Sequence, residues 1–205
     1  MSIRHDFMGL LAKTVTFSLR SQLVRLGMRR YDLNLIKVGH ELFDPVVEHP
    51  QIDEAVMRAR EVYAAAGLGI GRVEHFVINV ASASADGYLV IDEDDCEDLT
   101  SDWSVRNGAL DVFIVRTYSG TTAGSSPVGG SCDKTGKDPD GLIVESNPGG
   151  GLIQFSLPHE VGHFLGLEHR DDADAVMYFA APAGDRFSAG EAARMHRHCA
   201  IRPPC

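Results

Sequence analysis

Three histidines and a glutamate lie close together in the segment HEVGHFLGLEH, residues 159 to 169. His159 and His163 are four positions apart, so in a helix both imidazoles stand on one face, one turn apart, and can share a metal ion. Glu160 is one step round the same helix, where its carboxylate can reach a water on that metal without binding the metal itself. The pattern predicts a zinc site with Glu160 as general base.

A glycine explains the position of the third ligand. Gly166 can adopt the positive φ that ends a helix and turns the chain, after which His169 can swing back to the metal. Three neutral imidazoles leave a fourth coordination position for water, which is the open arrangement of a catalytic zinc. A structural zinc would use four protein ligands, usually including cysteine. We therefore expect one catalytic Zn²⁺ held by His159, His163 and His169.

The same segment, followed by Met177, resembles the extended zinc motif of the metzincin metalloproteases. The resemblance implies a zinc-dependent endopeptidase that hydrolyses peptide bonds in proteins or peptides. It also implies a methionine turn beneath the metal at residues 175–178, with a plain core methionine as the alternative. HFLGLEH is most similar to matrixin-like and pappalysin-like sequences. Arg170 does not match the usual residue after the third histidine, and Phe179 stands where some metzincins have tyrosine, so the subfamily stays open.

The fold that this resemblance implies is α/β (α+β). It has a twisted, mixed, mostly parallel sheet, two long helices, a zinc cleft and a small C-terminal subdomain with one helix. The apolar pattern of the chain agrees, since it predicts strands at residues 31–38, 73–80, 109–115 and 141–146 and an amphipathic helix at 50–67. A capping box formed by Ser188 and Glu191 predicts a last helix through about Cys199.

The strand at residues 141–146 is expected to offer an exposed edge to an extended substrate. Strand addition satisfies the main-chain groups of a peptide without demanding a particular sequence. The substrate would then contact Gly141, Leu142, Ile143 and Val144. The resemblance to the metzincins adds Pro182, because the corresponding segment, here residues 181–184, lines the pocket for the side chain just beyond the cleaved bond.

Two acidic segments are candidates for a structural Ca²⁺. The run at residues 92–98 is rich in carboxylates but lacks the alternating ligands and the glycine of a dedicated calcium loop, so a solvated acidic loop is the simpler interpretation. Asp133, Asp138 and Asp140 lie in a long glycine-rich loop, residues 119–140, of the kind that holds structural ions in some metzincins. A structural calcium ion is kept as a second cofactor hypothesis.

The length of 205 residues suits one catalytic domain, residues 30–205, with an upper part to about residue 169 and a lower part from about residue 170. Residues 1–29 form an N-terminal extension, for which a helix, an added strand and a pro-segment all stay open. The charge of 19 − 29 = −10 repels nucleic acid and anionic lipid, and no apolar run is long enough to cross a bilayer. We expect no nucleic-acid or membrane partner, and a monomer is favoured.

The four cysteines, Cys96, Cys132, Cys199 and Cys205, allow two disulfides or four thiols. A bond between Cys199 and Cys205 would tie down the C-terminus. No clear signal peptide is readable at the N-terminus. The compartment stays open, with a secreted or extracellular location preferred.

Two other functions are compatible with the motif. A catalytically weak, zinc-stabilised protein-binding module would use the same fold, although scaffolding alone would not need Glu160. A narrow-specificity effector or toxin protease would keep the chemistry and act on one target. The sequence does not separate that protease from a general one.

Overall fold

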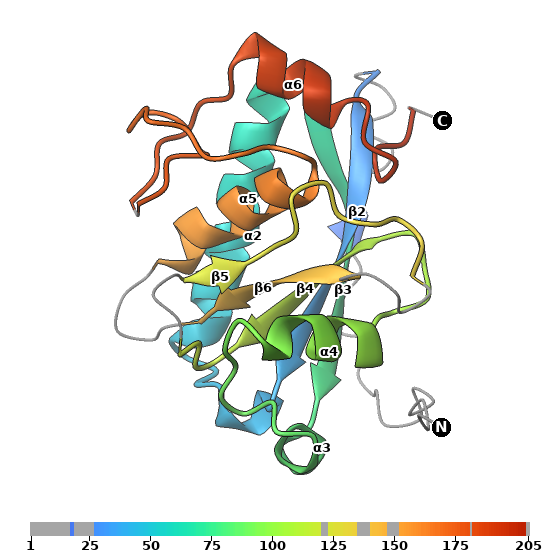
Figure 1. The fold of residues 1–205 in the computed structure, drawn as a ribbon, viewed down its shortest axis with the longest axis vertical. Coiled ribbons are helices and arrows are strands. Elements are labelled where there is room, and N and C mark those ends of the chain that lie inside the picture. The colour runs from blue at the N-terminus through green and yellow to red at the C-terminus, as the bar shows by residue number, and fades with distance from the viewer. Residues whose placement is uncertain are drawn as a thin grey trace.

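The computed structural model describes residues 17–18, 27–119, 123–134, 140–146, 152–180 and 182–203. Its strands are β1 (Phe17–Ser18), β2 (Arg29–Val38), β3 (Leu68–Ile78), β4 (Leu110–Val115), β5 (Gly124–Ser125) and β6 (Gly141–Glu145). They form one sheet in the order β1-β3-β2-β4-β6-β5 (Figure 1). The four inner strands are parallel to one another, and β1 and β5 pair antiparallel at the two ends of the sheet.

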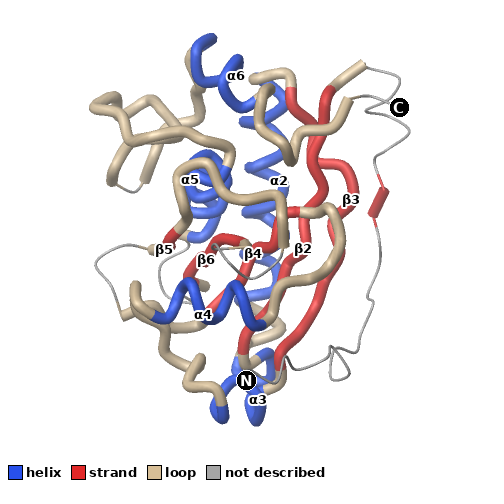
Figure 2. The backbone as a smooth tube through the Cα atoms, turned by 45° about the vertical axis from the view of Figure 1, so that its right-hand side comes forward, coloured by secondary structure: helices blue, strands red, loops and turns tan. Residues whose placement is uncertain are grey.

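Helices cover both faces of this sheet. The helices of the described residues are η1 (His40–Leu42), α2 (Glu48–Ala65), α3 (Val80–Ala85), α4 (Asp95–Asp102), α5 (Ile153–Phe164) and α6 (Ala189–Met195). Figure 2 shows α5 alongside α2, and these two helices share the larger apolar core with one face of the sheet. Residues of α3 and α4 pack in a second core on the other face. In the described part of the chain, none of the helices is both long and apolar enough to cross a membrane.

The faces of β2 follow the predicted alternation. Tyr31, Leu33 and Leu35 point into the larger core, whereas Ile36 and Val38 point into the second core. The helix predicted at residues 50–67 is α2, the strand predicted at 109–115 is β4, and Ser188 and Glu191 form the predicted capping box of α6. The expected mixed α/β fold is confirmed.

The third strand begins earlier than its pattern predicts, at Leu68 instead of residue 73. The missed residues include Gly71, which is a glycine for a packing reason. A Cβ at that position would lie 2.6 Å from Oδ1 of Asp32, which accepts a hydrogen bond from the backbone N–H of Arg72 at 2.8 Å. Glycine therefore allows the close approach of β2 and β3 at their bulge.

The acidic run was expected to be a solvated loop, and part of that expectation is wrong. From Asp95 onward the run forms α4. Asp92 Oδ1 accepts hydrogen bonds from the backbone N–H groups of Asp94, at 3.0 Å, and Asp95, at 3.2 Å. The carboxylate of Asp92 thus satisfies N–H groups at the start of the helix, as short polar side chains commonly do.

The prediction of an exposed edge at residues 141–146 is also wrong. These residues form β6, which pairs with β4 on one side and with β5 on the other. The residues predicted to contact substrate are therefore buried inside the sheet, namely Gly141, Leu142, Ile143 and Val144. The outermost strand is the two-residue β5, which the glycine-rich composition of residues 119–140 did not reveal.

Residues beyond His169 add one helix, α6, and no strand to the sheet in the part of the chain that the structure describes. They end against β2, where the backbone N–H of Arg30 donates to the carbonyl of Arg202 at 3.0 Å. Cys199 forms a disulfide with Cys132, so the predicted pairing of Cys199 with Cys205 is wrong. Cys205 lies outside the described residues. Of the N-terminal extension, the described β1 is an added strand on β3.

Candidate metal centre

Helix α5 positions the first part of the motif and ends where the sequence predicts. Gly166 has φ +96°, and its N–H donates to the carbonyl of His163 at 2.8 Å. The N–H of Leu167 donates to the carbonyl of Gly162 at 2.9 Å. This pair of bonds is the Schellman motif, in which a glycine with positive φ closes the helix. The chain then reverses and returns His169 to the helix.

The three imidazoles converge on one point. The Nε2 atoms of His159 and His163 are 3.1 Å apart, those of His163 and His169 are 3.1 Å apart, and those of His159 and His169 are 3.2 Å apart. An ion at ~2.0–2.1 Å from each nitrogen, the usual zinc distance, would then have N–metal–N angles of about 100°. Such angles lie close to tetrahedral, so the three side chains fit a zinc ion with one coordination position left over.

The hydrogen bonds of the imidazoles also point to a cation. Nδ1 of His159 lies 2.9 Å from the carbonyl oxygen of Val176, and Nδ1 of His163 lies 2.8 Å from that of Leu167. A carbonyl only accepts, so each Nδ1 carries the proton and each Nε2 presents a lone pair. Burial lowers the pKa of His159, and it lowers the pKa of His163 to about 4, so burial disfavours the charged form of both rings. The lone pairs of His159 and His163 therefore converge, and a cation between them and His169 Nε2 would satisfy all three nitrogens.

Met177 lies in a tight turn against α5. The N–H of Tyr178 donates to the carbonyl of Ala175 at 3.2 Å, and Met177 is fully buried. Its sulfur occupies the space that a side chain at Gly162 would fill. Because Val176 in the same turn accepts from His159, this turn supports the helix next to the three imidazoles.

Glu160 is 7% exposed, and burial raises its pKa to about 8. It faces the last strand of the sheet: a Cβ at Gly124 would lie 2.9 Å from Cγ of Glu160 and 3.1 Å from Oε1. A nearby divalent cation would favour the ionised carboxylate. The carboxyl group is therefore held between α5 and β5, beside the three imidazoles.

The three histidines and Glu160 line one cleft of about 530 Å³. The β5 side of the cleft includes Ser125 and Ser126. Other walls include Glu93, Tyr118, Leu152, Phe155, Ser156, Tyr178, Ala180 and Ala183. Pro182 is exposed and is not part of this lining, whereas Ala183 is buried in it, and Ala181 lies outside the described residues. No local pattern predicted that Glu93 and Tyr118 line the cleft, because they come from distant loops.

The predicted calcium ligands do not meet in the described part of the chain. Asp133 is exposed, Asp140 is buried, and Asp138 lies outside the described residues. Among described residues, the groups of three or more metal-binding side chains that converge are the histidine trio and a cluster of Cys132, His198 and Cys199. A structural Ca²⁺ stays an untested hypothesis.

No protein-family model matches the sequence, and no curated protein matches it either. Among solved structures, the chain is similar to the crystal structure of metalloproteinase-II from Bacteroides fragilis, with a TM-score of 0.52 and 16% sequence identity. The match covers 82% of this chain and 52% of that one, so the present chain spans about half the length of that protein. At this identity the match shows the fold alone: the chain shares a metalloproteinase fold, and a histidine trio suited to a metal ion lies in its cleft.

Proposed function

We propose that the protein is a zinc-dependent endopeptidase of the metzincin type, with Glu160 as its general base. One observation carries the proposal. Three imidazole Nε2 atoms lie 3.1 to 3.2 Å apart, two of them with tautomers fixed by backbone carbonyls, beside a buried carboxyl group in an open cleft. This combination suits a metal with a free coordination position, as in a hydrolase, better than a closed structural site.

His159, His163 and His169 would hold the zinc ion, and Met177 would be the methionine of the metzincin turn. Zinc bound there would polarise the scissile carbonyl and lower the pKa of a coordinated water from about 15.7 to about 7. Glu160 would accept the proton of the attacking water and deliver it to the leaving amine. Its position between α5 and β5 keeps the carboxylate within the cleft for both transfers.

The substrate would add to β5 instead of β6. A peptide that pairs antiparallel to β5 would have its N-terminal part at the Ser126 end of the cleft and its C-terminal part at the Ala123 end. The Ala123 carbonyl accepts from the N–H of Glu145 at the end of β6, and the chain after β6 leads to the start of α5. Leu152 and Phe155 line the cleft there, so they would receive a side chain from the C-terminal side of the scissile bond.

The proposal predicts separate effects on metal binding and turnover for Glu160→Gln. This variant keeps all three imidazoles, so it should bind one zinc per chain, while cleavage of a quenched-fluorescent peptide library falls by about 10²- to 10⁴-fold, the usual contribution of a general base. Glu168→Gln is the matched control, because Glu168 is exposed and outside the cleft lining.

The control should cleave like the unchanged protein. Undiminished turnover in Glu160→Gln would remove Glu160 from the mechanism. Zinc binding without cleavage of any peptide by the unchanged protein would favour the binding module, and one cut sequence in the whole library would favour a narrow-specificity effector protease.

A further inference from the structure

Residues 126–134 lead away from the cleft at Ser126 and contact the C-terminal end of α5. The backbone N–H of Gly129 donates to the carbonyl of His163 at 2.9 Å, and the N–H of Gly130 donates to the carbonyl of Phe164 at 2.8 Å. The last carbonyls of a helix have no partner within the helix, so these two bonds stabilise its final turn. One of the two acceptors belongs to a metal ligand.

The segment also continues directly from β5. Gly124 and Ser125 pair with β6, and Ser126 lines the cleft. The described part of the segment contains no helix or strand of its own after Ser125. Its placement therefore depends on a few contacts with other parts of the chain.

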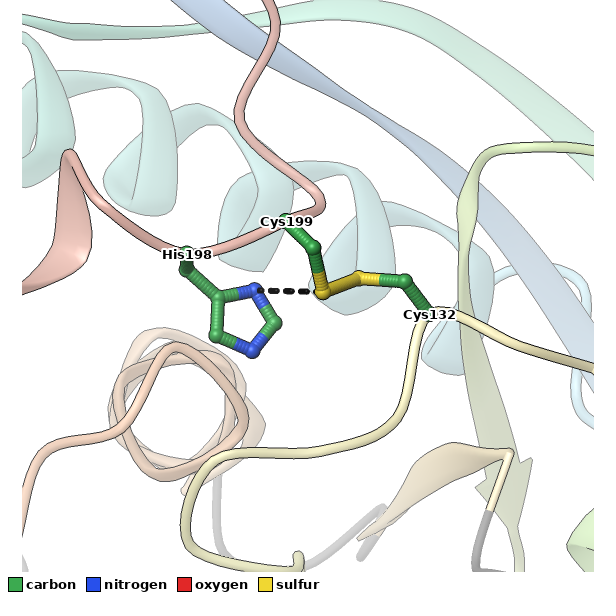
Figure 3. Close-up of side chains that lie close together, drawn as sticks. All are labelled: Cys132, His198 and Cys199. Carbon is green, nitrogen blue, oxygen red and sulfur yellow. Dashed lines mark hydrogen bonds between the residues drawn. A yellow bond between two sulfur atoms is a disulfide. The ribbon is translucent and has the colours of Figure 1, made fainter.

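The strongest of these contacts is covalent. Figure 3 shows the Cys132–Cys199 disulfide with the imidazole of His198 beside it. Cys199 follows α6, so the bond joins the segment to the C-terminal part of the chain across 67 residues of sequence. Both cysteines are exposed, so a reductant can reach the bond.

His198 adds a second contact at the same place. Its Nδ1 lies 3.3 Å from the N–H of Ala200 and accepts from it, so Nε2 carries the proton and donates to the carbonyl of Gly130 at 3.0 Å. The same ring packs edge-on against Phe164 at 5.5 Å between centroids. Nδ1 of His198 is thus occupied by a hydrogen bond, and the two sulfurs are bonded to each other. Cys132, His198 and Cys199 are therefore arranged as a disulfide with a neighbouring imidazole, and not as a second metal site.

We propose that the Cys132–Cys199 disulfide is a redox-dependent latch, which holds residues 126–134 over the end of α5 and so positions both His163 and the edge strand β5. A dithiol would open the latch. One thiolate of the dithiol attacks a protein sulfur and breaks the Cys132–Cys199 bond, its second thiol displaces the mixed disulfide, and two protein thiols and a cyclic disulfide result. The two electrons and two protons come from the dithiol.

Hydrogen exchange tests the latch without reference to catalysis. Opening should raise exchange at the Gly129 and Gly130 amides by at least about tenfold, because both are bonded only while the segment stays on α5. The comparison uses the full-length zinc-loaded protein before and after treatment with a dithiol, and after reoxidation, which should restore protection. Cys96→Ser is the matched control, since Cys96 is a free cysteine and should leave both states unchanged.

Zinc release to a chelator gives a second readout. Loss of a contact that supports a metal ligand commonly weakens binding by about 10- to 100-fold, so release should be about tenfold faster in the reduced protein and in Cys132→Ser/Cys199→Ser. Equal exchange and equal zinc release in the oxidised and reduced proteins would overturn the latch. More than one zinc per chain after reduction would overturn it in favour of a second metal site.

A lower rate of peptide cleavage on reduction is also expected, and this part alone rests on the proposed function. If the protein cleaves no peptide under any condition, the endopeptidase proposal fails while the exchange and zinc-release results still decide the latch.

Discussion

Gly162 and Gly124 occupy two positions at the metal centre where no side chain fits. A Cβ at Gly162 would overlap the sulfur of Met177, and one at Gly124 would lie within 2.9 Å of Glu160. Gly162 is inside α5, where glycine is an unfavourable choice by about 1 kcal/mol relative to alanine. Its presence there indicates that close packing of the methionine turn under the helix outweighs helix propensity.

We therefore expect Gly162→Ala to destabilise the protein although alanine favours a helix. Overpacking a filled site costs about 1–3 kcal/mol, more than the propensity gain. Gly190→Ala in α6 is the control: its nearest neighbouring atom is Ser188 Oγ at 3.9 Å, so it should stabilise by about 0.4–1 kcal/mol. Urea unfolding measures both. Stabilisation by both substitutions would show that Met177 can move aside at no cost.

At this scale the sequence predicted which residues lie together where their placement depends on local spacing. His159, Glu160 and His163 are set by helical periodicity, and Gly166 by the need for a positive φ, so a short segment contains all the information. Ala183 could not be found in this way. It lines the cleft because a loop folds back from the turn, and that path depends on packing outside the segment.

At the scale of elements, the loop that follows β5 is joined to the inner strand β4 by a buried ion pair. Lys134 Nζ lies 2.7 Å from Oδ1 of Asp111 and donates to the carbonyl of Val105 at 2.9 Å. The side chain of Asp111 is fully buried, and that of Lys134 is 11% exposed. Burial raises the pKa of Asp111, and the neighbouring ammonium opposes this rise. In the loop where we considered a calcium site, the ammonium group of Lys134 neutralises the carboxylate of Asp111.

Removal of Lys134 should leave that carboxylate uncompensated. We expect Lys134→Met to destabilise by about 3–5 kcal/mol, and Asp111→Asn/Lys134→Met to recover most of the loss, because replacing both charges of a buried pair is often nearly neutral. Urea unfolding of the unchanged protein, Asp111→Asn, Lys134→Met and the double variant gives the coupling energy. A double variant as unstable as the single one would mean that the contacts of the Lys134 side chain, and not its charge, stabilise the loop.

The same single variant should depend on pH in a definite direction. Without the ammonium, the folded-state pKa of Asp111 rises further above its unfolded value, so the folded protein binds the proton more tightly. The penalty is then fully present above the folded pKa and fades as the pH falls through it. Lys134→Met should therefore approach the stability of the unchanged protein toward acidic pH, as followed by unfolding at a series of pH values.

Element prediction succeeded where periodicity extends over many residues. The pattern of α2 repeats over 18 residues, and β4 is apolar at every position except Asp111, so both are readable without the rest of the fold. In contrast, β5 has two residues, Gly124 and Ser125, and exists because β6 offers it a partner. An edge strand of this kind is defined by pairing, which no local pattern contains.

At the scale of the whole molecule, the Cys132–Cys199 disulfide joins the loop after β5 to the segment after α6. The three histidines bring α5 together with the segment that follows it. An exposed disulfide persists in an oxidising environment. This supports the secreted or extracellular location that the sequence analysis preferred, which stays a proposal. The N-terminal domain boundary near residue 30 also stays a prediction.

Zinc should stabilise the folded chain, because the three ligands meet only when α5, its terminal turn and His169 are in place. At free zinc about a hundredfold above Kd, binding adds about 2.7 kcal/mol, which in a domain of this size raises Tm by about 5–10 °C. Chelation should reverse the shift. His169→Ala should lose most of it, whereas His40→Gln, on η1 and outside the cleft lining, should keep it. An equal zinc shift in His169→Ala would mean that the ion binds elsewhere, because zinc held only by His159 and His163 would not link α5 to the segment that contains His169.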